Sequence, residues 1–550
     1  MFRKSELVLG PLLGALFALA PAHGASPLDP AAINRIADAE FNHGELAETA
    51  AYLADRIGGR LTNSPAMREA ERWTAGKFRQ WGLKNVHTEG FEFGRGWWIE
   101  SAQVRMVAPR ALALRSIPIA WTPGTNGPLQ AAVIVAPMKA VKDFEQWKGK
   151  LAGKIVLISY PEPPKDPEEA AFKRLSDADI GKLNRYKEPQ LGMVDGEDSP
   201  VADVDIKRDL VKRIKFGRAL REFLEAEGAV AWAQMSRSEG RIVHGEGYFH
   251  QVGRTPQLPA VEIAAEDYRR IARLAKVGEV RMEIDSRVHF EDADSKAYNV
   301  VAEIPGSDAK SGFVMAGAHL DSWVAGDGAA DNGAGSVVVM EAARILASLD
   351  VKPKRTVRFA LWAGEEQGLL GSSAYVEQHL AQRPAPADPD LARFGMWFAE
   401  GYPIKTLAEF SQLSAYFNVD NGSGKIRGIY AEGNLAAVPI LREWLGPLAS
   451  MGTTAVVAEP TDWTDHVLMN RIGLPAFQFI QDPLDYESRV HHTDLDTFDH
   501  LRIDDLRQAS VVLATVLLDA ANSDTPMPRV PLPTEPRVTD PFHYDDPAQR

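Results

Sequence analysis

The pattern of hydrophobic and polar positions divides the chain into regions that predict different secondary structure. Between Tyr298 and Ala521, short apolar runs alternate with longer segments whose apolar residues recur at helical spacing. This alternation predicts an α/β domain with a largely parallel sheet. The expected strands are Val300–Ile304, Phe313–Ala318, Thr356–Trp362, Leu413–Val419 and Ala476–Ile480, and the expected helices are Gly335–Leu349, Leu369–His379, Ala436–Leu448 and Ile503–Ala521.

The preceding region, from about Ile117 to Val288, has the short β-branched runs of a β-rich module. Its polar, Pro-rich stretch from 161 to 200 is expected to form a long loop or an elaborated insertion. Further upstream, residues 46–81 predict two helices joined by a turn, and residues 86–107 are strand-rich. Within the module, strands are predicted at Ala132–Val135, Lys154–Ile158 and Ala229–Ala233, and a helix at Phe216–Glu227.

The first 24 residues are typical of an export signal. Arg3 and Lys4 precede the apolar run Leu7–Ala22, and small residues offer a cleavage point before Ala25. The alternative is an uncleaved membrane anchor, for which this run is short. Because no later stretch is comparably apolar, the mature protein is expected to be exported, either periplasmic or secreted, and free of the membrane.

Composition narrows the classes of function further. The 550 residues indicate two to four domains, and a net charge of −14 without a basic patch argues against nucleic acid as a partner. The absence of cysteine excludes disulfides, thiolate catalysis and thiolate zinc sites. The Pro-rich tail, residues 523–550, has no periodic apolar face and is expected to be extended.

Metal-binding side chains follow several of the predicted strands at the point where each strand ends. Ligands of an open α/β sheet gather at this edge. Clustered carboxylates repel one another unless a cation neutralises them, so the sequence predicts a metal site here. The residues concerned are His319 and Asp321, the pair Glu365 and Glu366, Asp420, the pair His491 and His492, and Asp327 and Asp331 in a Gly-rich loop.

Imidazole and carboxylate ligands without sulfur suit Zn²⁺, and Co²⁺ or Mn²⁺ could substitute. Two histidines and three carboxylates suffice for two ions held by a shared carboxylate. In an extended segment the side chains of adjacent residues point in opposite directions. One of the two neighbouring glutamates could therefore bind metal while the other accepts a proton from the attacking water.

These residues lie in four motifs that occur in a characteristic order. The motifs are GAHLDSWVAGDGAADNGAG (317–335), WAGEEQGLLGS (362–372), FNVDNGSG (417–424) and HHTDLDT (491–497). Together they resemble the M28 family of zinc exopeptidases, and most closely its carboxypeptidase Q-like branch, which contains a protease-associated domain. The resemblance implies a mixed, largely parallel sheet sandwiched by helices, the zinc exopeptidase fold, with an inserted β-rich module.

The resemblance also implies a role for each residue. His319 and Asp420 would bind one zinc ion, Glu366 and His492 the other, and Asp331 would bridge them. Glu365 would be the general base and acid. Asp321 would orient the ring of His319, and His491 would donate a hydrogen bond to the oxyanion or serve only the structure. Asn332 departs from the acid or proline of many relatives and is not expected to bind metal.

The implied domains are a signal peptide at 1–24, a discontinuous peptidase domain at 25–116 and 289–522, a protease-associated-like insert at 117–288, and the tail. The insert could narrow the cleft to short peptides or could serve packing alone. The segment Thr464-Asp465-His466 resembles a family segment near the pocket, and a structural histidine is an equal alternative.

The expected activity is hydrolysis of the terminal peptide bond of short peptides, as an aminopeptidase or dipeptidase. Recognition of a free carboxylate would need a cation such as Arg489. One alternative is an M20-like metallo-carboxypeptidase or deacylase, although Asp420 follows Glu366 by only 54 positions, which argues against it. The other is a receptor-like scaffold without activity. The oligomeric state stays open, a dimer included.

Overall fold

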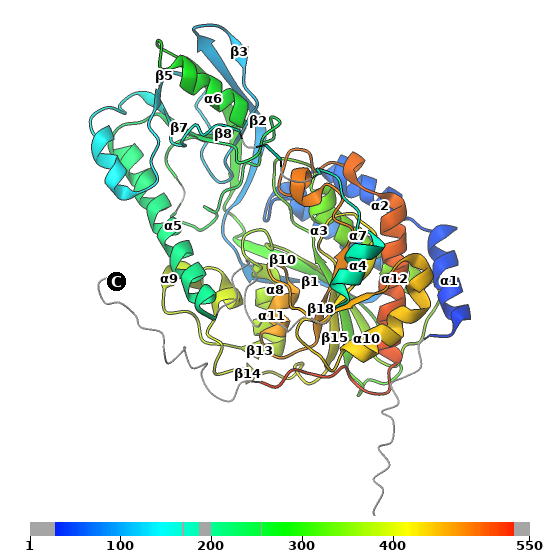
Figure 1. The fold of residues 1–550 in the computed structure, drawn as a ribbon. Helices are drawn as coiled ribbons and strands as arrows, with labels where there is room; N and C mark the ends of the chain where they lie inside the picture. The colour runs from blue at the N-terminus through cyan, green and yellow to red at the C-terminus, as the bar shows by residue number, and fades with distance from the viewer. Residues whose placement is uncertain (1–27, 165, 168–169, 186–199, 255, 533–550) are drawn as a thin grey trace, which may run out of the picture.

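The computed structural model describes residues 28–164, 166–167, 170–185, 200–254 and 256–532. The predicted export signal and most of the Pro-rich tail lie outside this range. The chain forms two lobes (Figure 1). We call them the α/β lobe, built on residues 28–92 and 296–532, and the β-rich lobe, built on residues 96–291.

The α/β lobe is built around an eight-stranded mixed sheet. Its four central strands are parallel neighbours, and antiparallel pairs flank them. The predicted strands are all present. In spatial order the sheet comprises β1 (Lys84–Glu92), β10 (Lys296–Ile304), β12 (Thr356–Trp362), β11 (Phe313–His319), β15 (Leu413–Asn418), β18 (Ala476–Gln481), β16 (Ile426–Tyr430) and β17 (Ala455–Val457).

Helices cover both faces of this sheet, because successive side chains of each strand point to opposite sides. Val314 and Ala316 of β11 pack into the core beneath the long helices, whereas Phe313 and Met315 pack into the opposite core. The predicted helix-covered mixed sheet is therefore confirmed. One face carries α3 (Pro65–Gln80), α7 (Ala334–Ser348) and α12 (Ile503–Asn522), and the other carries α8 (Leu370–Tyr375) and α11 (His466–Asn470).

Shorter helices complete the lobe. The predicted helix at 369–379 is divided, because α8 passes into a wider helical turn at Val376–Leu380. The predicted helix at 436–448 is likewise α10 (Val438–Leu445) followed by a tighter turn. The others are α1 (Pro30–Phe41), α2 (Leu46–Ala51) with its continuation Tyr52–Ile57, and α9 (Pro389–Ala392).

The β-rich lobe has a second eight-stranded sheet with its own apolar cores. The boundary predicted at residue 117 falls inside this sheet, since β2 pairs along its length with β9. The strands in order are β3 (Leu112–Ala113), β2 (Gly96–Ala108), β9 (Arg281–Glu291), β5 (Leu129–Val135), β6 (Lys154–Leu157), β7 (Ala231–Met235), β8 (Ala260–Ile263) and β4 (Ser116–Pro118), with helices α5 (Pro200–Ala226) and α6 (Ala265–Leu274).

The segment predicted as a Pro-rich loop contributes to the α/β lobe. Its helix α4 (Asp177–Leu183) packs Ile180 against Ala455 and Val457 of β17. Arg174 forms ion pairs with Asp482 and Asp505, at 3.0 and 2.7 Å. This part of the segment therefore packs against the α/β lobe, although it lies between strands of the β-rich lobe in the sequence.

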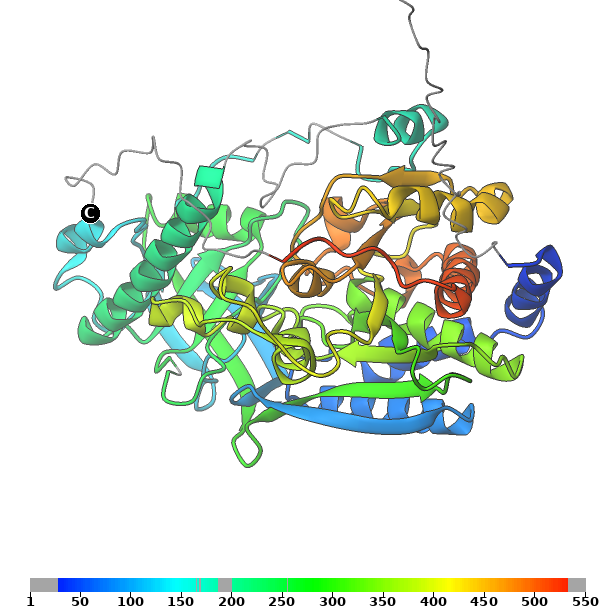
Figure 2. The same ribbon diagram turned by 90° about the horizontal axis from the view of Figure 1, so that it is seen from below.

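The two lobes are joined where the chain leaves β1 and where it enters β10. The side chain of Asn63 donates hydrogen bonds to the main-chain oxygens of Gly94 and Asp294, at 2.9 and 2.8 Å. A second contact is made by α5, where Arg218 pairs with Asp390 of α9 (Figures 1 and 2). A cavity of about 1350 Å³ is lined by residues of both lobes. Among the described residues, no helix has the length and apolar character needed to span a bilayer.

Candidate metal centre

The predicted metal ligands converge on the floor of the cavity between the lobes. His319 is the last residue of β11, Asp420 follows β15, and Glu365 and Glu366 follow β12. Asp331 lies in the loop before α7, and His491 and His492 follow the helical turn Tyr486–Val490. All seven side chains line the cavity. Residues that are up to 173 positions apart thus meet at the carboxyl edge of one sheet.

One group of potential ligands centres on His319. Its Nε2 atom lies 3.3 Å from Oδ1 of Asp331 and 3.3 Å from Oδ1 of Asp420. The three side chains are almost completely buried. Their ligand atoms lie close enough together to hold one metal ion.

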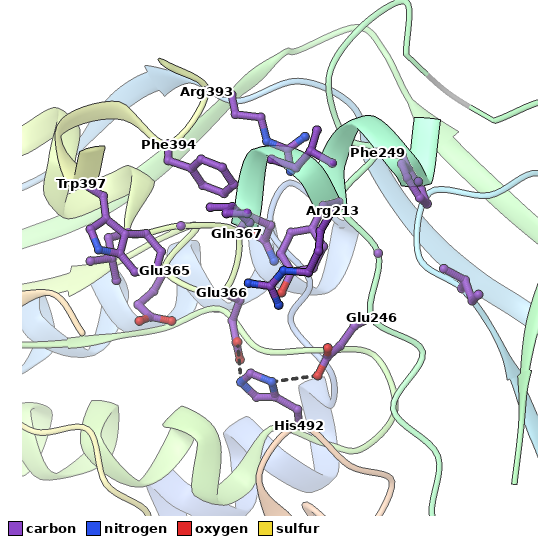
Figure 3. A pocket seen from close by; sticks show the side chains of 18 of the residues that line it. Arg213, Glu246, Phe249, Glu365, Glu366, Gln367, Arg393, Phe394, Trp397 and His492 are labelled. Atoms are coloured by element: carbon purple, nitrogen blue, oxygen red, sulfur yellow. Dashed lines mark hydrogen bonds and ion pairs between the residues drawn. The ribbon is translucent and has the colours of Figure 1, made fainter. Parts of the chain in front are cut away.

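A second group surrounds His492. Its Nε2 atom lies 3.0 Å from Oε2 of Glu366 and 3.3 Å from Oδ2 of Asp331 (Figure 3). His491 is also within reach, with its Nε2 atom 3.7 Å from the same oxygen of Asp331. Asp331 thus contributes one carboxylate oxygen to each group, as expected of a bridging ligand.

The electrostatics of this floor fit divalent cations. Oδ2 of Asp331 and Oε1 of Glu366 are buried and accept no hydrogen bond from the described residues. Burial, with repulsion from Asp331, raises the pKa of Glu366 to about 8. Buried carboxylates cost free energy unless a cation or hydrogen-bond donors compensate them. Imidazole and carboxylate donors without sulfur suit zinc and related divalent ions.

Glu365 occupies a different place from its neighbour. Its carboxylate lies apart from that of Glu366 (Figure 3), with Oε2 3.9 Å from Nε2 of His319. Like Glu366, it is outside both sets of three ligand atoms that lie within 4.8 Å of one another, namely those of His319, Asp331 and Asp420 and those of Asp331, His491 and His492. Burial raises the pKa of Glu365 well above its usual range. A carboxylate with a raised pKa next to a metal site has the position and the basicity of a general base.

Asp321 acts on the backbone of the glutamate pair. Its buried carboxylate accepts hydrogen bonds from the amides of Glu365 and Glu366, at 3.2 and 3.3 Å, and from the hydroxyl of Thr62 at 2.9 Å. The carboxylate lies 3.7 Å from Nδ1 of His319, whereas the main-chain oxygen of Asp321 lies 3.0 Å from it. The main chain of Asp321 therefore makes the short contact with the imidazole.

Two further residues fix the loop that carries Asp331. The carboxylate of Asp496 accepts hydrogen bonds from the amides of Ala330 and Asp331, at 2.6 and 3.0 Å. The side chain of Asn332 donates to the main-chain oxygen of Val419 at 2.9 Å and accepts from the amide of Gly335 at 2.8 Å. Asn332 consequently ties the loop to the strand end that presents Asp420.

Sequence reasoning missed Glu246, which reaches the centre from the β-rich lobe. Its Oε1 atom lies 2.9 Å from Nδ1 of His492 (Figure 3). Arg237 holds the carboxylate through two hydrogen bonds, at 2.6 and 3.0 Å. Burial alone would raise the pKa of Glu246, but the hydrogen bonds from His492 and Arg237 outweigh it and lower the pKa. No local signal marks this contact, because it joins residues 246 positions apart.

The remaining candidates from the sequence are outside the two ligand groups. Nε2 of His466 lies 3.0 Å from the hydroxyl of Thr461 and 3.2 Å from Glu432, and the side chain is buried. Asp465 accepts a hydrogen bond from Ser372. Arg489, the cation considered for a substrate carboxylate, is exposed and is not among the residues that line the cavity.

Comparisons with known proteins agree with this geometry. Residues 299–517 match the sequence profile of peptidase family M28. Carboxypeptidase Q of Rattus norvegicus is 25% identical over 476 residues, which cover 85% of this chain and 83% of that protein.

Two solved structures share the fold. The structure of a peptidase M28 precursor from Shewanella amazonensis SB2B has a TM-score of 0.62 at 23% identity and covers 92% of this chain and 99% of its own. That of BSAP, a zinc aminopeptidase from Bacillus subtilis, has a TM-score of 0.52 at 19% identity and covers 87% and 95%. The two structures agree in fold, and the profile match covers the segment that carries the converging ligands. Residues 299–517 thus carry the sequence of an M28 peptidase, and the comparisons support a metallopeptidase of the carboxypeptidase Q-like branch.

Proposed function

We propose that the protein is a two-zinc exopeptidase that hydrolyses the terminal peptide bond of short peptides, as an aminopeptidase or a dipeptidase. The observation that supports it most directly is the pair of ligand groups that share Asp331, beside the separate carboxylate of Glu365. In this proposal His319 and Asp420 hold one ion, Glu366 and His492 hold the other, and Asp331 bridges them. Co²⁺ or Mn²⁺ could replace zinc in the same ligand set.

Bound divalent ions supply Lewis acidity, which polarises the scissile carbonyl and lowers the pKa of water. The protein's own groups do the rest. Glu365 accepts a proton from the attacking water and then donates it to the nitrogen of the leaving amine. Its burial favours this cycle, because burial raises the pKa of the carboxyl group and makes the carboxylate a stronger proton acceptor. Asp321 orients Glu365 by accepting its main-chain amide.

His491 has two possible contributions in this proposal. Its Nε2 atom faces Asp331, and its ring stacks on that of His492 with the centroids 3.8 Å apart. Burial and the neighbouring His492 lower the pKa of His491. A neutral imidazole in this position can donate a hydrogen bond to the oxyanion of the tetrahedral intermediate or bind metal.

We further propose that the β-rich lobe is a protease-associated-like insert, comprising residues 117–288 together with β2 and the end of β9. Its separate sheet and its separate cores support this division. Because Glu246 and α5 reach the cavity from this lobe, the insert limits the room for substrate and favours short peptides. The sequence of residues 1–24 supports export to the periplasm or the medium.

The proposal is tested with a panel of dipeptides and longer peptides whose termini are free or blocked. Each peptide is assayed with the wild type and with Glu365→Ala, with and without a chelator, and bound metal is measured for both proteins. We expect two zinc ions per chain, turnover that the chelator abolishes, and cleavage that stops when the α-amine is blocked. Glu365→Ala is expected to retain its metal and lose most of its turnover.

The outcomes also separate the alternatives. A purified protein that binds no divalent ion would support the receptor-like scaffold. An M20-like carboxypeptidase or deacylase would accept peptides with a blocked amine, and the family assignment already argues against it. Equal turnover by Glu365→Ala would remove Glu365 from the mechanism.

A further inference from the structure

The wall of the cavity opposite the metal centre is rich in arginine. Helix α5 presents one face to the cavity, with lining residues that recur at intervals of three and four positions. Arg213, Arg218 and Arg221 belong to this face. Arg254 and Arg393 line the same cavity from neighbouring loops. A chain with a net charge of −14 thus gathers five guanidinium groups in one place.

Three of these arginines have no carboxylate partner among the described residues. Arg218 and Arg254 share Asp390 as a partner, the latter at 3.8 Å. Arg213, Arg221 and Arg393 form no ion pair within the described part of the chain, and we call these three the arginine wall. Figure 3 shows Arg393 on the side of the pocket away from His492, and Arg213 extending from α5 into the pocket.

The surroundings leave the arginine wall able to bind an anion. The guanidinium carbon of Arg221 lies 4.4 Å from the ring centre of Phe249, and that of Arg393 lies 4.7 Å from the ring centre of Phe394. Stacking on an aromatic face holds the plane of a guanidinium group and leaves its N–H edge available for a carboxylate.

The arginine wall is also under electrostatic strain when nothing is bound. Burial, with the charge of Arg218, lowers the pKa of Arg221 to about 10, so the group stays charged at neutral pH. Burial and the charge of Arg254 likewise lower the pKa of Arg393. Two glutamates line the same face of α5, and Glu225 is engaged with the main-chain amide of Gln257 at 3.2 Å. A bound anion would relieve the repulsion among the cations.

One cavity thus has a metal centre on its floor and unpaired guanidinium groups on the opposite wall. We propose that the arginine wall selects peptides whose portion beyond the scissile bond is anionic, by binding the carboxylates of that portion. Three guanidinium groups exceed what a single α-carboxylate requires, since one arginine binds one carboxylate through two parallel hydrogen bonds. The preferred leaving portion therefore carries an acidic side chain in addition to the C-terminal carboxylate. This inference rests on the proposed exopeptidase function.

Four substrates with the same N-terminal alanine separate the two sources of carboxylate. Ala-Gln-NH₂ has none beyond the scissile bond, Ala-Gln has the α-carboxylate, Ala-Glu-NH₂ has the side-chain carboxylate, and Ala-Glu has both. We expect kcat/KM of the zinc-loaded wild type to rise with each carboxylate, by about tenfold for a well-placed charged contact. The rise is expected mainly in KM, because the arginine wall binds and does not react.

Three single substitutions, Arg213→Gln, Arg221→Gln and Arg393→Gln, are compared on the same substrates. Each is expected to reduce the ratio of kcat/KM for Ala-Glu over Ala-Gln-NH₂ by about tenfold or less, and the triple variant is expected to abolish it. Arg393→Lys should restore part of the ratio. Lys212→Gln is the matched control, because it removes a positive charge one position from Arg213 on a residue that does not line the cavity; it should leave the ratio unchanged.

Arg213 is exposed, so its variant is expected to fold even if substitution of the more buried Arg221 disturbs the structure. Metal content and thermal unfolding check this for each variant. The inference is overturned if the ratio of kcat/KM for Ala-Glu over Ala-Gln-NH₂ is near one in the wild type, or if it survives the triple substitution. In either case, chelator-sensitive hydrolysis of Ala-Gln-NH₂ would still support the exopeptidase proposal. An absence of turnover on every peptide overturns both.

Discussion

Oε1 of Glu246 lies 2.9 Å from Nδ1 of His492, so a residue of the β-rich lobe holds a potential metal ligand of the α/β lobe. The ring nitrogen opposite Nδ1 faces Asp331 and Glu366. A carboxylate on the far side of a metal-binding imidazole fixes both its tautomer and its orientation. The β-rich lobe is therefore coupled to the candidate metal centre through this imidazole ring.

Replacing Glu246 is expected to weaken binding at one of the two metal positions. For Glu246→Ala we expect zinc affinity at that position to fall by about 10- to 100-fold, the range typical of such supporting residues. Competition with a fluorescent chelator measures it, and activity should return with excess zinc. Glu239→Gln, which alters another arginine-paired glutamate of the same lobe, is the control and should have wild-type affinity. Unchanged zinc affinity in Glu246→Ala would show that His492 needs no support from the second lobe.

The neighbouring glutamates are expected to give opposite results when each is changed to glutamine. Glu365→Gln should retain two metal ions and lose about 10²- to 10⁴-fold in kcat, the usual contribution of a general acid–base group. Glu366→Gln should lose one ion, because its carboxylate belongs to the second ligand group. Metal content and kcat measured on the same preparations distinguish the two, and identical metal loss in both variants would contradict the assignment.

Asn332 is expected to contribute to stability by linking the Asp331 loop to the end of β15. Asn332→Ala leaves the amide of Gly335 without its acceptor, and a buried unsatisfied group costs about 1–3 kcal/mol. Urea unfolding of the metal-free proteins measures this cost without the contribution of metal binding. Asn42→Ala, at an exposed helix end, is the control and should change stability by less than about 0.5 kcal/mol. A comparably small effect at Asn332 would show that the loop holds its conformation independently.

Glu71, a buried residue of α3, leads to a prediction for how the stability of the protein depends on pH. Burial raises the pKa of Glu71 to about 7, although Arg68 lies 3.2 Å away. The folded state therefore binds this proton more tightly than the unfolded state, and its contribution to stability is lost as pH rises from about 4.5 to about 7.

Glu71→Gln should therefore become more stable relative to the wild type as pH rises, by up to about 3 kcal/mol at pH 8. Urea unfolding of both proteins between pH 5 and pH 8 measures the difference. Glu69→Gln, an exposed change on the same helix, should show no such trend. A difference between Glu71→Gln and wild type that is independent of pH would mean that Glu71 has an ordinary pKa in the folded protein.

The sequence predicted those features that have local signals. The strands of the α/β sheet are continuous apolar runs, and residues such as His319 and Asp420 are found because they directly follow such runs. Local sequence does not show which sheet a strand joins, so the pairing of β2 with β9 in the second sheet could not be predicted. Glu246 and the arginine wall could not be predicted from the sequence for the same reason, because their contacts depend on how one lobe is placed against the other.

The β-rich lobe begins and ends at neighbouring points, where Arg95 and Asp292 form an ion pair at 2.8 Å. The polypeptide between them, which we call the cassette, therefore starts and ends at one place, and every strand of the α/β sheet lies outside it. A protein that lost the cassette would keep the residues proposed to bind zinc and to transfer protons. It would lose, in one deletion, the carboxylate that supports His492 and two of the three residues of the arginine wall, Arg213 and Arg221.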